Sequence, residues 1–288
     1  MKQRVYQIEV NDKVIIAENS SGVQARVQFD VTVDAVGNIT LCDLNLSNLA
    51  ESTISTVFKR GTVLAIRAGY EDNIDYIFRG IIRQVFRGRE GPTTYTNILA
   101  RGGQLEKNNI NKALGKNAKL SEILQAIADA LGYKLNITKS EFADVYPTGY
   151  SMTNDPVKSL RDLAYAWKFE WAIENDSLVI FKVENGRKAP KKTINMQNGL
   201  EGIPEVTDVG VNFSVRMNPS IKIGNKIELD TKYKSFNFSG VYYNNELQDA
   251  AGSGTYTVMK IVYSGDNYGQ QWTTRVTSYR YPKQLETI

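Results

Sequence analysis

The stretch that decides the fold is "GTYTVMKIVYSGDNYGQQWTTRVTSYRY", residues 254–281. Its first half alternates apolar and polar residues, breaks at Ser-Gly-Asp-Asn, and resumes as a run rich in threonine and aromatic residues. Such alternation is the pattern of a half-buried β-strand, and a Gly/Asp/Asn cluster between two strands is typical of a hairpin turn. We predict a β-hairpin with a tight turn at Gly265 and a positive φ at that glycine. The residues expected to set its turn and register are Gly265, Asp266, Asn267, Gly269 and Trp272.

Length and composition indicate a folded protein of two or three domains. The chain has 288 residues, of which 42% are hydrophobic and 23% charged, and its net charge is only +4. It contains no apolar run near the ~18 residues of a membrane-spanning helix, so we expect no membrane span. The N-terminal "MKQRVYQIEVNDKVII" alternates like a strand, so we expect no export signal.

The chain lacks the residues on which most catalytic and metal sites depend. It has no histidine and a single cysteine, Cys42, which lies in an alternating strand pattern typical of a small apolar residue. No phosphate-binding glycine motif is present. We therefore expect no catalytic site, no cofactor and no bound metal. Asp72, Asp75 and Asp176 lie in Asn/Asp-rich segments and are interpreted as turn formers.

The hydrophobic pattern divides the chain into three predicted parts. Residues 1–110 contain short alternating strands, interrupted only near residues 48–61, where one short helical turn fits. Residues 111–187 contain two amphipathic helices. One spans 121–131 with Ser121 as N-cap and Gly132 as stop, and the other spans 156–167 with Asn154 or Asp155 as N-cap and Pro156 at the first helical position. Residues 188–288 return to strands. The predicted fold is mainly β: two antiparallel β-barrel domains that flank a small α+β middle domain.

The last part echoes the first. The stretch "KRGTVLAIRAGY", residues 59–70, parallels "KIGNKIELDTKY", residues 222–233, and the strands that follow each stretch are also similar, with Gly88 matching Gly265. Such self-similarity favours two related β domains.

Three features together resemble the baseplate hub proteins of bacteriophage tails and the hub-like part of the type VI secretion spike. They are the barrel, α+β, barrel order, the hairpin "YTVMKIVYSGDNYGQQWTT", and the turn-rich segment "GIPEVTDVGVNFSVRMNPSIKIGNKIEL", residues 202–229. The resemblance implies that the second barrel starts in this segment, marked by Pro204, Asn218, Pro219 and Gly224.

The resemblance implies a structural protein and not an enzyme. It implies a homotrimeric ring that joins the six-fold tail tube to the three-fold central spike and encloses part of the DNA channel. The implied partners are the tail tube protein or distal tail ring, the spike protein and the tape measure protein. DNA would pass through the channel without sequence-specific binding. The implied location is the virion, after synthesis in the host cytoplasm.

Two other functions remain open at this stage. A tail-associated hydrolase of cell-wall glycans needs only two acids, which can lie far apart in sequence. A β-barrel protein that binds nucleic acid would need a basic, aromatic strand face, which the sequence does not show. The basic cluster Arg187, Lys188, Lys191 and Lys192 is interrupted by Pro190 and is interpreted as a solvated linker.

Overall fold

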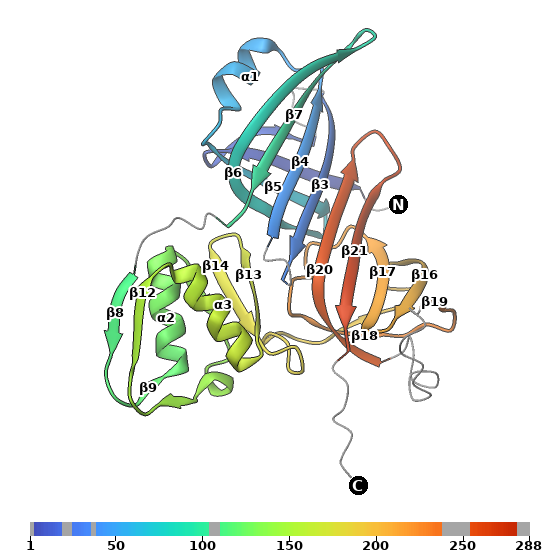
Figure 1. Ribbon diagram of the computed structural model, residues 1–288. Helices are drawn as coiled ribbons and strands as arrows, with labels where there is room; N and C mark the ends of the chain where they lie inside the picture. The colour runs from blue at the N-terminus through green and yellow to red at the C-terminus, as the bar shows by residue number, and fades with distance from the viewer. Residues whose placement is uncertain (1–2, 19–24, 36–38, 104–109, 238–253, 281–288) are drawn as a thin grey trace.

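The computed structural model describes residues 3–18, 25–35, 39–103, 110–237 and 254–280, and it has three parts (Figure 1). The N-terminal part is strand-rich, and its short helix covers one end. Its elements are β1 (Arg4–Val10), β2 (Lys13–Ala17), β3 (Arg26–Asp34), β4 (Ile39–Ser47), α1 (Glu51–Val57), β5 (Val63–Tyr70), β6 (Asn73–Glu90) and β7 (Thr93–Arg101).

The middle part is an α+β unit with its own hydrophobic core, which both helices line. Its elements are β8 (Ile110–Leu114), β9 (Ala118–Lys119), α2 (Leu120–Leu131), β10 (Lys134–Asn136), the 3-10 helix η1 (Lys139–Phe142), β11 (Val145–Tyr146), β12 (Tyr150–Asn154), α3 (Pro156–Trp167), β13 (Glu170–Glu174) and β14 (Ser177–Phe181). The aromatic residues Phe169 and Trp171 are buried in this core.

The predicted helix signals are largely confirmed. Asp155 accepts a hydrogen bond from the Val157 N–H at the start of α3, and proline occupies the first turn. Gly132 ends α2 in the left-handed conformation. The predicted N-cap at Ser121 is wrong, because α2 begins one residue earlier and Lys119 stands at the N-cap.

The C-terminal part returns to strands, as predicted. Its elements are β15 (Lys192–Ile194), β16 (Leu200–Thr207), β17 (Gly210–Arg216), β18 (Lys226–Leu229), β19 (Ser235–Asn237), β20 (Gly254–Asp266) and β21 (Trp272–Tyr279). The strands of both terminal parts belong to one sheet, with the order β19-β16-β17-β21-β20-β3-β4-β7-β6-β5-β1-β2. Two further strands lie off this path: β18 pairs with β20, and β15 pairs with β18. No closed barrel is detected among the described residues, so the two closed barrels stay a prediction.

One strand pair joins the terminal parts. β20 pairs with β3 antiparallel over seven residues, from Lys260 opposite Asp34 to Asp266 opposite Gln28. The two strands lie side by side in Figure 1 although they come from opposite ends of the chain. One continuous hydrophobic core includes Val31 of β3 and Ile261 of β20. The sequence pattern predicted the strands but not this pairing.

The similarity between the two terminal parts is also found in their strand pairing. β5-β6-β7-β4-β3 in the first part and β18-β20-β21-β17-β16 in the second pair in the same order, always antiparallel. The strands also follow one another along the chain in the same sequence, except that β19 is inserted before β20. We call these two five-strand sets the N-terminal unit and the C-terminal unit.

Hydrogen bonds at the turn before β5 and β18 match atom for atom. In each unit the turn glycine donates its N–H to a strand carbonyl, at 2.9 and 2.8 Å, and that strand residue donates back to the residue after the glycine at 3.0 Å. A β-bulge directly follows the strand residue in both units. The matched residues are Gly61, Thr62 and Ile82 in the N-terminal unit and Gly224, Asn225 and Val258 in the C-terminal unit.

The structure corrects two expectations about Gly265. Counted from the bulge, Gly265 corresponds to Arg89 and not to Gly88. It also lies within β20 opposite Trp272, outside the turn and without a positive φ. A Cβ atom at this position would lie 2.3 Å from the Phe29 ring and 2.8 Å from the Trp272 ring, so glycine is needed because two aromatic rings cover its place.

We predict that Gly265→Ala lowers the free energy of unfolding by about 1–3 kcal/mol, because the added methyl group displaces packed rings. The matched control is Gly115→Ala, where φ is not positive and no atom lies within 4 Å of the added Cβ. That substitution should be neutral or stabilising by up to about 1 kcal/mol. Urea unfolding measures both, and equal stability of the two variants would contradict the packing explanation.

Candidate functional site

Two sets of contacts hold the three parts of the chain together, and they contain most of the residues singled out in the sequence. The first is the hairpin tip, residues 266–271, which lies between β20 and β21. The second is the junction segment, residues 217–224, which lies between β17 and β18.

The Asp266 carboxylate organises the hairpin tip. Oδ1 accepts the backbone N–H groups of Tyr268 and Gly269, both at 3.0 Å, and so closes the loop over its own backbone. Oδ2 accepts from Arg26 at 2.6 Å and from Gln28 at 3.1 Å, two side chains of β3. The same carboxylate therefore sets the shape of the loop and ties it to the N-terminal unit.

The Asn267 side chain takes the place of a strand residue beside the start of β3. Its Oδ1 accepts the Val27 N–H at 2.8 Å, and its Nδ2 donates to the Ala25 carbonyl at 3.1 Å and to the Tyr6 hydroxyl at 3.0 Å. Its backbone N–H donates to the Val27 carbonyl at 3.1 Å. Asn267 thus extends the β3–β20 pairing beyond the end of the strand.

Trp272 and Arg4 complete the tip. The indole N–H of Trp272 donates to the Gly69 carbonyl of β5 at 3.0 Å, and its ring packs edge-on against Phe29 with centroids 5.6 Å apart. The Arg4 guanidinium lies 5.6 Å from the indole centroid and donates to the Gly269 carbonyl at 2.6 Å. All five residues predicted to set the hairpin therefore lie at or beside the tip, and their partners outside the hairpin lie in the N-terminal part of the chain.

The hydrogen bonds and burial of Asp266 change the pKa of its carboxyl group. Burial favours the neutral carboxyl, but hydrogen bonds from Arg26 and from the Tyr268 and Gly269 N–H groups outweigh it and lower the pKa of Asp266 below its ordinary value. The carboxylate is therefore charged at neutral pH, and the contacts it accepts depend on that charge.

The junction segment brings together three of the four residues predicted at the start of the second barrel. Asn218 Oδ1 accepts the Ser220 N–H and the Asn73 side-chain N–H, each at 3.1 Å, which links the segment to the β5–β6 turn. Pro219 is buried beside it. Pro204 lies apart in β16, where its carbonyl accepts a hydrogen bond from the Ser235 hydroxyl at 3.2 Å.

Gly224 is the residue of the junction segment that contacts both β20 and the middle part. Its φ of +77° suits glycine, and a Cβ atom would lie 2.8 Å from the Phe181 ring of β14. Its N–H donates to Val258 at 2.8 Å, and its carbonyl accepts the Arg187 N–H at 2.7 Å. The C-terminal unit and the middle part thus meet at this backbone.

A largely buried ion pair reinforces the same junction. Glu174, at the end of β13, accepts the Ile223 N–H at 2.8 Å and pairs with Arg187 at 2.7 Å. Both side chains are about one-seventh exposed, 13% and 14%. The interpretation of the basic cluster as a solvated linker is therefore wrong for Arg187, although Lys188 is exposed as expected. No local signal in the sequence pairs Arg187 with Glu174.

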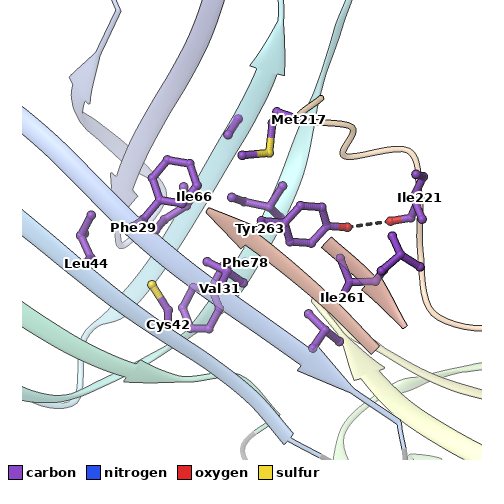
Figure 2. Close-up of a cluster of buried hydrophobic side chains, with 14 of the residues drawn as sticks. Phe29, Val31, Cys42, Leu44, Ile66, Phe78, Met217, Ile221, Ile261 and Tyr263 are labelled. Atoms are coloured by element: carbon purple, nitrogen blue, oxygen red, sulfur yellow. Dashed lines mark hydrogen bonds between the residues drawn. The ribbon is translucent and has the colours of Figure 1, made fainter. Parts of the chain in front are cut away.

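Tyr263 connects the junction segment to the shared core (Figure 2). Its ring lies in the core of β20 near Ile261, and its hydroxyl donates to the Ile221 carbonyl at 2.6 Å. Burial raises the pKa of Tyr263 well above its usual value, so the hydroxyl stays protonated as a donor. Cys42 lies in the same core as a small buried residue, as predicted.

Of the acidic residues considered for catalysis, Asp72 and Asp176 lie in turns, as predicted, whereas the turn prediction is wrong for Asp75, which lies in β6. Asp72 lies in the turn before β6, and Asp75 forms an ion pair with Lys222 at 3.3 Å. Asp176 lies between β13 and β14 and pairs with Arg79 at 3.4 Å. Within the described residues, no group of three or more Cys, Asp or Glu side chains is arranged to hold a metal ion, and no helix is long and apolar enough to cross a membrane.

A sequence model of the family described as baseplate hub gp41 matches residues 6–277, nearly the whole chain. The chain belongs to the baseplate hub gp41 family. Membership supports a structural role in a phage tail and a place in the phage particle. A search of curated protein sequences finds no match.

Solved structures share the fold of this hub-family chain at low sequence identity. The prophage MuSo2 43 kDa tail protein from Shewanella oneidensis aligns with a TM-score of 0.62 and 10% identity, over 97% of each chain. The tail protein from Neisseria meningitidis MC58 aligns with a TM-score of 0.60 and 8% identity, over 96% of each chain.

The E. coli c3393 protein is a third structural relative, described as a type VI secretion component similar to the T4 phage tail proteins gp27 and gp5. It aligns with a TM-score of 0.55 and 8% identity, over 96% of this chain and 77% of that one. Together, the family match and these relatives confirm the resemblance to phage tail hubs.

We predict that acid weakens the hairpin tip through Asp266. Because the folded pKa lies below the unfolded value of about 3.9, the stabilisation is complete above that value and is lost as pH falls through the folded pKa. Asp266→Asn should be less stable at pH 7 and should show a flatter decrease in stability below about pH 4. Thermal melting from pH 7 to pH 2.5 checks this, and parallel curves for the two proteins would contradict it.

We predict that Glu174→Leu destabilises the chain by about 3–5 kcal/mol, because it leaves the Arg187 charge buried without a partner. Glu174→Gln, which can still accept the Ile223 N–H, should lose less, about 1–3 kcal/mol. The double variant with Arg187→Leu should recover part of the loss. A double variant less stable than Glu174→Leu alone would refute the pairing as the cause.

Proposed function

We propose that three copies of this chain form a ring in the phage tail that joins a tube with six-fold symmetry to a spike with three-fold symmetry. The observation that carries the proposal is the internal repeat: one chain contains two five-strand units with the same strand order, the same bulge and matched turn hydrogen bonds. Three chains then present six related units to the tube and three chains to the spike.

The β3–β20 pair supports a ring of this kind. Because the two units share one sheet, they lie next to each other and cannot swing apart without breaking seven residue pairs of a buried strand ladder. The hairpin tip and the junction segment lock the same connection through Asp266, Asn267 and Asn218. A rigid pair of adjacent units is what a closed wall requires, and cyclic assembly covers strand edges that would otherwise be exposed.

The middle part lies to one side of the shared sheet in Figure 1, with α2 and α3 directed away from the strand pair that joins the units. This placement supports a position for the helices outside the channel wall. There the middle part can brace neighbouring copies or receive other tail proteins, while the two β units form the wall.

The proposed partners follow from the place of such a ring. The tail tube protein or a distal tail ring docks on the six-unit face, the central spike docks on the three-fold face, and the tape measure protein reaches the ring from within the tube. DNA passes through the channel without sequence-specific contact. The chain is made in the host cytoplasm and functions in the virion.

Electron cryomicroscopy of purified tails tests the proposal. We predict three copies of the chain in one ring, both β units at similar radius, and α2 and α3 outside the wall. A ring of six copies, or two units at clearly different radii, would overturn it. The measurement is direct, because copy number and radius can be read from the symmetry and the map.

A further inference from the structure

Corresponding strand edges in the two units differ in what covers them. In the C-terminal unit, pairing of β18 with β20 ends at Thr257, and the remainder of β20, Lys260–Asp266, is covered by β3. In the N-terminal unit, pairing of β5 with β6 ends at Ile81, the position that corresponds to Thr257. The stretch of β6 beyond it, residues 84–90, pairs with β7 on one side. Among the described residues, no strand pairs with its other side.

Exposure of the side chains follows the same difference. Tyr263 in β20 is 2% exposed, whereas Arg87, the corresponding residue of β6, is exposed. Phe86 beside it is 49% exposed, so a large aromatic side chain stands at the open edge. Seven residues of open strand edge with an exposed aromatic side chain form a template for another strand.

Helix α1 does not take the place of the missing strand. It lies beside this part of β6 in Figure 1, and Glu51 pairs with Arg87 at 3.2 Å. The junction segment occupies the corresponding place in the C-terminal unit and contacts the corresponding residue, Tyr263. There the edge of β20 is still free to pair with β3. A contact of this kind is therefore compatible with a strand at the edge.

We infer that the open edge of β6, residues 84–90, pairs with the outer edge that β16 and β19 form in a second copy of this chain. The internal repeat indicates this partner. Within one chain β20 pairs with β3, and β16 is the strand of the C-terminal unit that corresponds to β3. Among the described residues, β16 and β19 end the sheet at that side, and all three residues of β19 are exposed. This inference rests on the proposed ring.

Charge and apolar surface on the two edges are complementary. Residues 83–90 of β6 carry three arginines and one glutamate, whereas residues 200–208 in and after β16 carry three acidic residues and no basic one. Exposed apolar side chains stand on both edges, Phe86 on one and Ile203 and Phe236 on the other. The open edges can therefore bury both kinds of surface against each other.

The contact is head-to-tail, since different surfaces of the two copies meet, and such contacts close into rings when the rotation per copy allows it. In a trimer, three β3–β20 pairs within chains would alternate with three contacts between β6 and the β16–β19 edge of the next copy. Every unit would then have a neighbour on each side through a related strand pair.

Cysteine cross-linking tests the pairing. Val262, which corresponds to Phe86, lies opposite Thr32, and the matching place on the outer edge is Thr207, which pairs with Asn237 of β19. Tails assembled from equal amounts of Phe86→Cys and Asn237→Cys chains are treated with a short bis-maleimide, and a second set uses Thr207→Cys to detect direct pairing to β16. The native Cys42 is buried. The control partner is Tyr165→Cys, on α3 and 91% exposed.

We expect covalent dimers between Phe86→Cys chains and chains altered at Asn237 or Thr207, and only background linking with Tyr165→Cys. A chain that carries both cysteines should give closed covalent trimers. Tails that contain three copies but show no such link would overturn the inference and leave the proposed ring intact. Links formed around a ring of six would retain the strand pairing and overturn the trimer.

Discussion

The pairing of β20 with β3 is the contact on which the rest of the molecule depends. It turns two strand-rich parts, separated along the chain by the whole middle part, into one sheet with one core. The hairpin tip extends this ladder at one end through Asp266 and Asn267, and the junction segment braces the middle of the ladder through Tyr263, which lies opposite Val31. Because the two units are related, this pair also indicates which strand edge can pair with the open edge of β6.

Local features of the fold could be predicted from the sequence because they depend on neighbouring residues. Strict alternation gave the span of β1, and Asp155 with the following proline gave the start of α3. The β3–β20 pair could not be predicted in this way, since many strands have compatible patterns and only the packed core selects among them. Gly265 illustrates the same limit: its neighbours along the chain indicated a turn, whereas its reason lies in the ring of Phe29, far away in sequence.

Among the functional residues too, those with a local sequence signal were predicted, and those that depend on long-range contacts were not. The composition pointed away from catalysis, and the turn-forming residues pointed to the hairpin tip. The ion pair between Glu174 and Arg187 was missed, because a charged residue in a Pro- and Lys-rich stretch has the local pattern of a solvated surface. The sequence showed that the two terminal parts are loosely similar. The residue-by-residue alignment of the two units came only from the structure, where the matched hydrogen bonds and β-bulges give a common starting point.

The distance along the chain between β3 and β20 has a consequence for synthesis. Ser264 and Asp30, which share a hydrogen bond across the pair, are 234 positions apart. Contacts of such high sequence separation form late, and the ribosome adds only about 5–20 residues per second. For many seconds the nascent chain therefore carries β3 without its partner strand, a state open to mispairing and to chaperones. A nascent chain cannot present its joined pair of units before almost all of it has been made, so unfinished chains are kept out of the assembly.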